Sequence, residues 1–168
     1  MSSGPTTPHP LPVGIHQKSA GRTSPRYVPL RVHGHPSFLA GVDAPGTLLQ
    51  RAACLGLPAL ALTDVDHCAG AVELIEAAEA LGGPRPIIGA ELSDPSGRPG
   101  RVISLVESAE GWRSLCRLLS ARQLGADPGD IDTEPTGPED FDLIDALREW
   151  NEGLIFLVDH PRLLLGLM

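Results

Sequence analysis

Two histidines separated by one glycine, His33 and His35, form the most chemically suggestive pattern in the chain. They end an apolar stretch that begins at Tyr27 and that predicts a strand. Because residues two apart in a strand share a face, this spacing directs two imidazole rings toward one point. Imidazole binds divalent metals, and metal-assisted phosphoester hydrolysis is chemistry that such a nucleus serves. The same spacing also arises by chance, so the pair alone establishes no site.

Two further predicted strand ends carry side chains of the same chemical kind. Asp64, Asp66 and His67 follow an apolar segment that ends at Thr63, and Glu91 lies near the end of the next apolar segment. If these strand ends meet at one edge of a sheet, the side chains form a carboxylate-and-imidazole site for one or more divalent ions. The alternative is structural: Asp64 caps the following helix, His67 faces solvent, and Glu91 accepts from backbone amides.

The elements that must position these residues alternate along the chain. The predicted strands are 27–33, 58–63, 86–92, 101–106 and 153–158, and the predicted helices are one capped by Asp43 that ends before Gly56, 69–81, 110–124 and 139–150. This order predicts an α/β fold, either a parallel sheet or a β/α barrel, with its site at the carboxyl ends of the strands. The fourth strand is expected to pair with the third as a hairpin or to lie beside it.

Inside the helix over 110–124, Trp112 and Cys116 recur with leucines at helical spacing, which predicts core packing for both. The segment 125–138 is rich in Asp, Gly and Pro and is expected to be a surface loop. Its acidic residues do not have the spacing of a calcium loop. Residues 1–26 are rich in Pro, Ser and Thr and are expected to be a disordered leader.

Charge and cysteine usage exclude several classes of protein. All 21 acidic residues lie from Asp43 onward, together with 9 of the 13 basic ones, so this part carries a formal charge of −12. An acidic body repels phosphate backbones, which excludes broad electrostatic binding of DNA or RNA. The cysteines at 54, 68 and 116 form no Cys-x-x-Cys pair and are expected to be reduced, mostly buried thiols of a cytoplasmic protein. No apolar run reaches the roughly 18 residues of a membrane span.

The order of these motifs resembles the polymerase-and-histidinol-phosphatase (PHP) family, in particular the N-terminal PHP domain of bacterial DNA polymerase III alpha subunits, replicative or error-prone. The segment 27–39 is similar to the first motif of the family, 59–64 with 69–72 to the second, and 86–92 to the third. The segment 110–120 resembles a stretch of the polymerase branch that small histidinol-phosphatase-like members are not expected to carry.

The resemblance implies a distorted TIM-like β/α barrel with a site for zinc, manganese or magnesium. Carried over residue by residue, it implies that His33, His35, Asp64 and Glu91 are metal ligands, with His67 and His160 as further candidates. A complete site in this family supports metal-dependent phosphoesterase or 3′–5′ exonuclease activity. Nucleotidyl transfer by the DNA-directed DNA polymerase belongs to residues far downstream and cannot reside in this chain.

The chain departs from the family's pattern at several positions. Val65 stands where the second motif has a histidine, Ala40 where the first has an aspartate, and Arg101 or Val102 where a histidine is common. An aliphatic side chain cannot ligate a metal. We therefore expect a degraded site with little activity alone. A noncatalytic scaffold that binds partners is the alternative, and a free-standing phosphoesterase is a second one.

The late motifs of the family do not occur before Met168. Without the leader roughly 140 residues remain, too few to close a barrel of this kind. We therefore expect residues 27–168 to be the N-terminal part of a PHP domain with an incomplete barrel, truncated or split from a longer polymerase. The polymerase body or other replication subunits would cover its open edges and apolar faces, and DNA would be reached only through that assembly.

Overall fold

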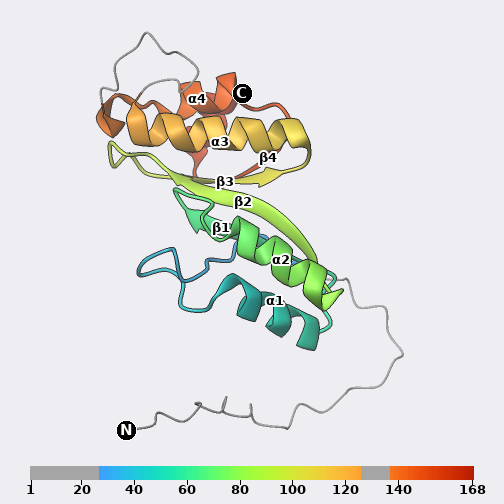
Figure 1. Ribbon diagram of the computed structural model, residues 1–168. Helices are drawn as coiled ribbons and strands as arrows, with labels where there is room; N and C mark the ends of the chain where they lie inside the picture. Colours follow the sequence, from blue (N-terminus) through green and yellow to red (C-terminus); the bar gives the residue numbers. More distant parts are fainter. Residues whose placement is uncertain (1–26, 126–136) are drawn as a thin grey trace, which may run out of the picture.

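The computed structural model describes residues 27–125 and 137–168, and within them a four-stranded sheet is flanked by helices (Figure 1). The predicted leader and the segment 126–136 lie outside the described residues. The strands are β1 (Ala59–Val65), β2 (Arg85–Ser93), β3 (Arg101–Val106) and β4 (Leu154–Val158). The helices are α1 (Pro45–Cys54), α2 (Ala71–Leu81), α3 (Ala109–Leu124), α4 (Leu143–Glu149) and α5 (Pro161–Leu167), with a short 3-10 helix, η1 (Pro138–Asp140).

The sheet has the order β1-β2-β3-β4 and is mixed, so the α/β class is confirmed. The strands β1 and β2 are parallel, whereas β3 is antiparallel to both β2 and β4. The connection over 94–100 is too short for a parallel crossover, so β2 and β3 form a hairpin, which is one of the two arrangements expected for the third and fourth predicted strands. The sheet is open, which is consistent with an incomplete barrel. The carboxyl ends of β1, β2 and β4 and the start of β3 share one edge.

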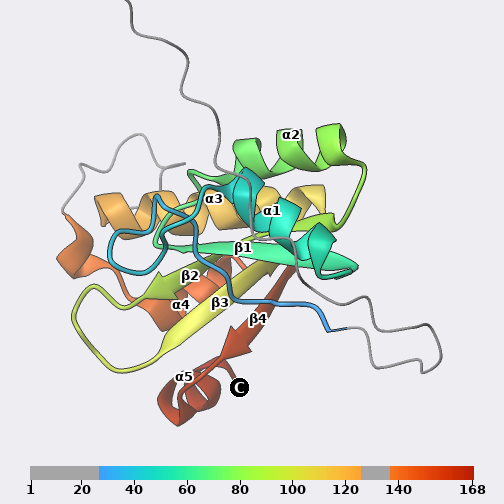
Figure 2. The same cartoon turned by 90° about the horizontal axis from the view of Figure 1, so that it is seen from below.

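Two hydrophobic clusters divide the molecule into two lobes. One lies between α1, α2 and β1 and is built around Leu49, Leu62 and Leu74. The other joins β2 and β3 to α3, α4 and α5 and includes Leu92 and Leu118. Figure 1 shows β2 as a long curved strand that runs from one lobe to the other, and Figure 2 shows α5 beyond the end of β4, away from α1 and α2. The strand β2 therefore connects the two hydrophobic clusters.

The expected first strand, 27–33, runs beside β1 but is not a regular strand. Pro29 has no N–H to donate, and the N–H of Val32 donates to the Thr63 hydroxyl oxygen rather than to a carbonyl. Two backbone bonds still tie the segment to β1, from the Ala61 N–H to the Pro29 carbonyl and from the Thr63 N–H to the Val32 carbonyl. The segment is extended and fixed in place without forming a ladder.

Several local expectations at the helices were wrong. Ala44, not Asp43, is the N-cap of α1, and no side chain caps it. The predicted helix over 139–150 is broken: η1 comes first, and α4 starts after Asp142, whose carboxylate accepts from two backbone N–H groups. The helix α5 was not expected at all. Its Pro161 sits at the first turn, where a missing N–H costs nothing.

The predicted burial of Trp112 and of the thiols is also corrected. Trp112 is 40% exposed, although Leu115 and Leu119 of the same helix are buried, because α3 packs through a narrower face than the spacing suggested. Of the three free cysteines, Cys54 is exposed and the other two are half-buried. Burial raises the pKa of the Cys68 thiol. In the part of the chain that the structure describes, no helix is long and apolar enough to cross a membrane.

A close backbone contact makes one helical glycine irreplaceable. A Cβ at Gly111 of α3 would collide with the Gly153 carbonyl. Gly111→Ala is therefore expected to lower the free energy of unfolding by roughly 1–3 kcal/mol, although alanine is the better helix former. Gly46 of α1 has only ordinary contacts around the same position, so Gly46→Ala is expected to raise stability by up to about 1 kcal/mol. Urea unfolding followed by circular dichroism measures both, and a stabilising Gly111→Ala would contradict the packing.

Candidate functional site

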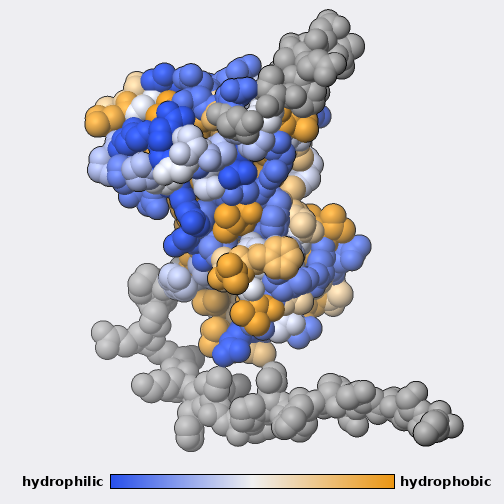
Figure 3. Space-filling model, turned by 90° about the vertical axis from the view of Figure 1, so that its left-hand side faces the viewer, coloured by the Kyte–Doolittle hydropathy of each residue, from blue (hydrophilic) through white to orange (hydrophobic). Residues whose placement is uncertain are grey.

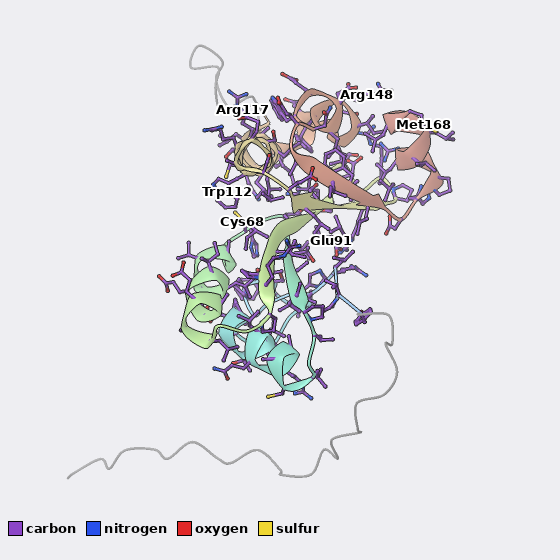
Figure 4. All side chains as sticks on the ribbon, turned by 90° about the vertical axis from the view of Figure 1, so that its right-hand side faces the viewer. Cys68, Glu91, Trp112, Arg117, Arg148 and Met168 are labelled. Atoms are coloured by element: carbon purple, nitrogen blue, oxygen red, sulfur yellow. The ribbon has the colours of Figure 1, made fainter. Side chains whose placement is uncertain are left out.

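The site begins with the alternation of β2. Ala90 and Leu92 face the helices and are buried in the larger cluster. Glu91 between them points to the opposite face of the sheet, because successive strand residues alternate. It pairs with Ile103 of β3, so Arg101, two residues before Ile103, shares that face. Glu91 is fully buried, and Figure 4 shows it in the middle of the molecule, between the two lobes.

Three side chains with nitrogen donors, two arginines and one histidine, surround the Glu91 carboxylate. Arg31 binds it in a bidentate manner, with Nε 2.6 Å from Oε2 and a terminal nitrogen 3.0 Å from Oε1. His33 Nε2 lies 2.9 Å from Oε2, and a terminal nitrogen of Arg101 lies 2.5 Å from Oε1. Both arginines are about half exposed, at 57% and 48%. Two fixed cations and an imidazole therefore satisfy both oxygens of this carboxylate.

The charge of Glu91 is stabilised by these donors and not by solvent. Burial would raise the pKa of Glu91, but hydrogen bonds from Arg31, Arg101 and His33 and the attraction of the Arg31 charge outweigh it. The pKa of Glu91 falls from 4.5 to about 2. The same hydrogen bond raises the pKa of Arg31. Glu91 is thus an anion at any physiological pH, locked in an ion-paired cluster.

Asp64 organises the loop that follows His33. Its Oδ1 accepts from the Gly34 N–H at 2.7 Å and from the Ser37 hydroxyl at 2.6 Å, and the Val65 N–H donates back to that hydroxyl at 3.0 Å. Oδ2 of Asp64 is buried with no hydrogen-bond partner among the described residues. The expectation that Asp64 caps the next helix was wrong, because α2 begins after Gly70 and has no side-chain cap.

The remaining candidate histidines lie apart from Glu91. His35 is exposed at the start of a turn, where the chain leaves the extended conformation, whereas the half-buried His33 ring contacts Glu91. His67 follows Asp66, whose φ is +61, so its ring turns to the Pro36 carbonyl and the Ala69 N–H. His160 caps α5, where Nδ1 accepts from the Arg162 N–H. Across 27–125 and 137–168, no group of three His, Cys, Asp or Glu side chains is placed to hold a metal ion.

Asp66 has a structural partner. Its carboxylate accepts from the Ser93 N–H and hydroxyl and pairs with Arg122 of α3 at 2.8 Å. The Arg122 guanidinium also donates to the Ser93 carbonyl at 2.9 Å. This tie fixes the end of β2 against α3, so Asp66 is engaged in holding the two lobes together.

Sequence reasoning assigned no role to Arg31, Ser37 or Asp159. Arg31 lies two residues before His33, so the period of an extended chain could have placed both on one face. Asp159 accepts from the Arg101 N–H and, with Glu91 and the two arginines, lines a cavity of about 130 Å³. No sequence signal identifies Asp159, because its position depends on the pairing of β3 with β4.

Comparison with known proteins relates the chain to one family. The model of the PHP domain matches residues 29–165. The error-prone DNA polymerase of Anaeromyxobacter sp. (strain K) is 43% identical over 105 residues, which are 61% of this chain and 9% of that protein. The error-prone DNA polymerase of Mycolicibacterium paratuberculosis is 43% identical over 113 residues, 62% of this chain and 10% of that protein. The chain thus spans about a tenth of the length of these relatives.

Among solved structures, an amidohydrolase from Chromobacterium violaceum is 26% identical with a TM-score of 0.43. The match covers 73% of this chain and 49% of that one.

The Glu91 cluster gives the chain a defined acid sensitivity. A carboxylate whose folded pKa is about 2 stabilises the fold above its ordinary value of 4.5, and this contribution is lost as the pH falls toward 2. Glu91→Gln is expected to lower the free energy of unfolding at pH 7 by on the order of 2 kcal/mol, allowing for solvent at the half-exposed arginines. Urea unfolding between pH 7 and pH 2 is expected to show the two proteins converging. Glu110→Gln, which breaks an exposed pair with Arg113, is the control and should change little. A difference that stays constant down to pH 2 would contradict the cluster.

The hydrogen bonds of the loop that Asp64 organises can be tested by comparing Ser37, which lies in the loop, with Ser104, a buried serine of β3. Ser37→Ala removes a hydroxyl that both donates and accepts, so it is expected to cost roughly 1–3 kcal/mol. The Ser104 hydroxyl is equally buried but has no partner among the described residues, so Ser104→Ala is expected to be neutral or stabilising. Thermal unfolding compares the two variants. Equal losses would show that burial, and not hydrogen bonding, decides the outcome.

Proposed function

Because the chain belongs to the PHP domain family, we propose that it is the PHP part of an error-prone-type bacterial DNA polymerase III alpha-like protein, acting in DNA replication or repair synthesis. Its role is that of a scaffold with a degraded phosphoesterase or 3′–5′ exonuclease site and little activity of its own. Residues 27–168 form the N-terminal part of that domain. The carrying observation is the state of Glu91, whose two oxygens are bound by Arg31, Arg101 and His33.

This donor set does not fit a divalent metal. A metal at Glu91 would have to displace at least one guanidinium and then sit beside a fixed positive charge, which repels it. Arginine cannot be deprotonated to relieve that repulsion. The candidate ligands His35, His67 and His160 lie elsewhere, and Asp64 spends one oxygen on the loop over 34–37. Oδ2 of Asp64 is the buried carboxylate oxygen that has no hydrogen-bond partner among the described residues, and over 27–125 and 137–168 no three His, Cys, Asp or Glu side chains assemble around a metal position.

The physical logic of the replacement is charge compensation. A carboxylate buried as deeply as Glu91 needs positive charge nearby. In a metal site that charge is an ion, whereas here it is supplied by two arginine side chains, one from the segment beside β1 and one from β3. The same contacts join three segments of the sheet edge. In this proposal, the contacts around Glu91 hold the sheet edge together and do not support catalysis.

The proposal also fixes partners and location. A scaffold of this kind contacts the polymerase body or other replication subunits, and it reaches DNA only through that assembly, consistent with the acidic composition from Asp43 onward. The protein would act in the cytoplasm with reduced thiols.

Metal titration tests the proposal directly. The metal-free chain is expected to bind neither Zn²⁺ nor Mn²⁺ stoichiometrically in isothermal titration and to leave 3′-labelled single-stranded DNA intact. Removing both cations in the variant Arg31→Ala/Arg101→Ala frees Glu91 and is expected to raise the affinity for Mn²⁺ at least tenfold, because the repulsion is gone. Arg113→Ala, which removes an exposed arginine elsewhere, is the matched control.

The opposite result is equally clear. If the unmodified chain binds two or more equivalents of metal and degrades DNA from its 3′ end, and if His33→Ala abolishes the degradation, the scaffold proposal is wrong. Turnover of small phosphomonoesters would instead favour a free-standing phosphoesterase.

A further inference from the structure

The loop between the site and α1 exposes three large apolar side chains in a row of uncharged residues. Phe38 is 91% exposed, Leu39 109% and Val42 90%. Between His35 and Asp43 the chain carries no charged side chain. The loop projects to the left in Figure 1, and Figure 3, which faces that side, shows hydrophobic atoms gathered in the middle of the face. A group of three large apolar side chains exposed to this degree is typical of an interaction site.

The loop is held rigidly although its apolar side chains touch little. The Ser37 N–H donates to the Gly34 carbonyl, and the Ser37 carbonyl accepts from Ala40 and Gly41. The His35 N–H donates to the Asp43 carbonyl at 2.8 Å and closes the loop. A Cβ at Gly41 would collide with the Gly34 carbonyl, so the two backbones lie in direct contact. The buried hydrogen bond between Ser37 and Asp64 anchors the whole turn to β1.

The backbone at Leu39 displays its side chain outward. Its φ of +64 lies in the left-handed region, which a leucine adopts only at a cost. The Leu39 side chain is completely exposed, so burial of this side chain does not offset the conformational cost. Strain of this kind persists where the surrounding structure imposes it and is concentrated at functional sites. The loop therefore presents its apolar side chains in a fixed arrangement. Such preorganisation lowers the entropic cost of binding a partner.

Resting on the proposed function, we propose that Phe38, Leu39 and Val42 insert into an apolar pocket on the polymerase body of the alpha-like protein. Two observations select this occupant. The matched relatives continue for about nine tenths of their length outside the region shared with this chain, so a large polypeptide is available to cover the loop. The loop has no cation for a phosphate backbone or an anionic membrane, so an uncharged protein pocket is its complement.

The test measures binding of the chain to the polymerase body, expressed as a separate polypeptide and shown to be folded by nucleotide incorporation on a primed template. Phe38→Ser and Leu39→Asn are each expected to weaken binding tenfold or more, as truncation of a central anchor does. Asparagine tolerates the left-handed backbone, so Leu39→Asn should keep or raise the melting temperature. Val72→Thr, at an exposed valine of α2, is the matched control and should bind as the unmodified chain does.

The outcomes separate the two proposals. If the unmodified chain binds the body and both loop variants bind equally well, the loop inference is overturned and the proposed function stands. If the unmodified chain does not bind the body, both fail. Self-association that Phe38→Ser abolishes, measured by light scattering, would assign the loop to a second copy and overturn the inference. Phe38-dependent binding of labelled oligothymidylate would assign it to a nucleic acid and overturn it as well.

Discussion

The neutralisation of Glu91 is the constraint on which the site depends. A fully buried carboxylate costs several kcal/mol unless positive charge and hydrogen bonds compensate it. Arg31 and His33 come from the extended segment beside β1, and Arg101 comes from β3, so one anion joins chain segments that are distant in the sequence. This contact adds to the two backbone bonds that tie the irregular segment to β1, since Pro29 and the side-chain bond at Val32 leave that segment without a regular ladder. The ion pair between Arg31 and Glu91 therefore helps to hold a segment that has few backbone hydrogen bonds to the sheet.

The same edge of the sheet carries two further polar anchors. Asp64 holds the loop after His33 through Gly34 and Ser37, and Asp66 holds the end of β2 to α3 through Arg122. Each anchor pairs a carboxylate from β1 or just after it with donors on another element. Acidic residues at the end of β1 and just after it thus accept hydrogen bonds from several other elements. Apolar residues of β1 pack into the cluster with α1 and α2, whereas these acidic residues hold separate neighbours.

Much of the fold could be predicted from the alternation of apolar residues. The helices 69–81 and 110–124 and the strands around Glu91 were found because their periods of 3.6 and 2 are strong and local. The hairpin of β2 and β3 was one of two expected arrangements, and the sequence did not decide between them, because the short connection over 94–100 matters only once the strands are known to be neighbours. Trp112 was assigned to the core because spacing reports which face a residue occupies but not how wide the buried face is. Within the site, the positions of Glu91 and His33 were found, whereas the arginines that bind Glu91 depend on register and on a side chain that reaches across strands.

The identity of the cations at Glu91 sets the conditions under which this edge of the sheet keeps its charge. A bound ion is exchangeable, and its occupancy follows the supply of free metal, the presence of chelators and the protonation of its ligands. A guanidinium is covalently part of the chain and remains charged over the whole accessible pH range. The arginines therefore make the charge balance of this edge a fixed property of the polypeptide, independent of metal homeostasis and of competition among metals. The contacts around Glu91 would then keep the same form whether zinc and manganese are scarce or plentiful.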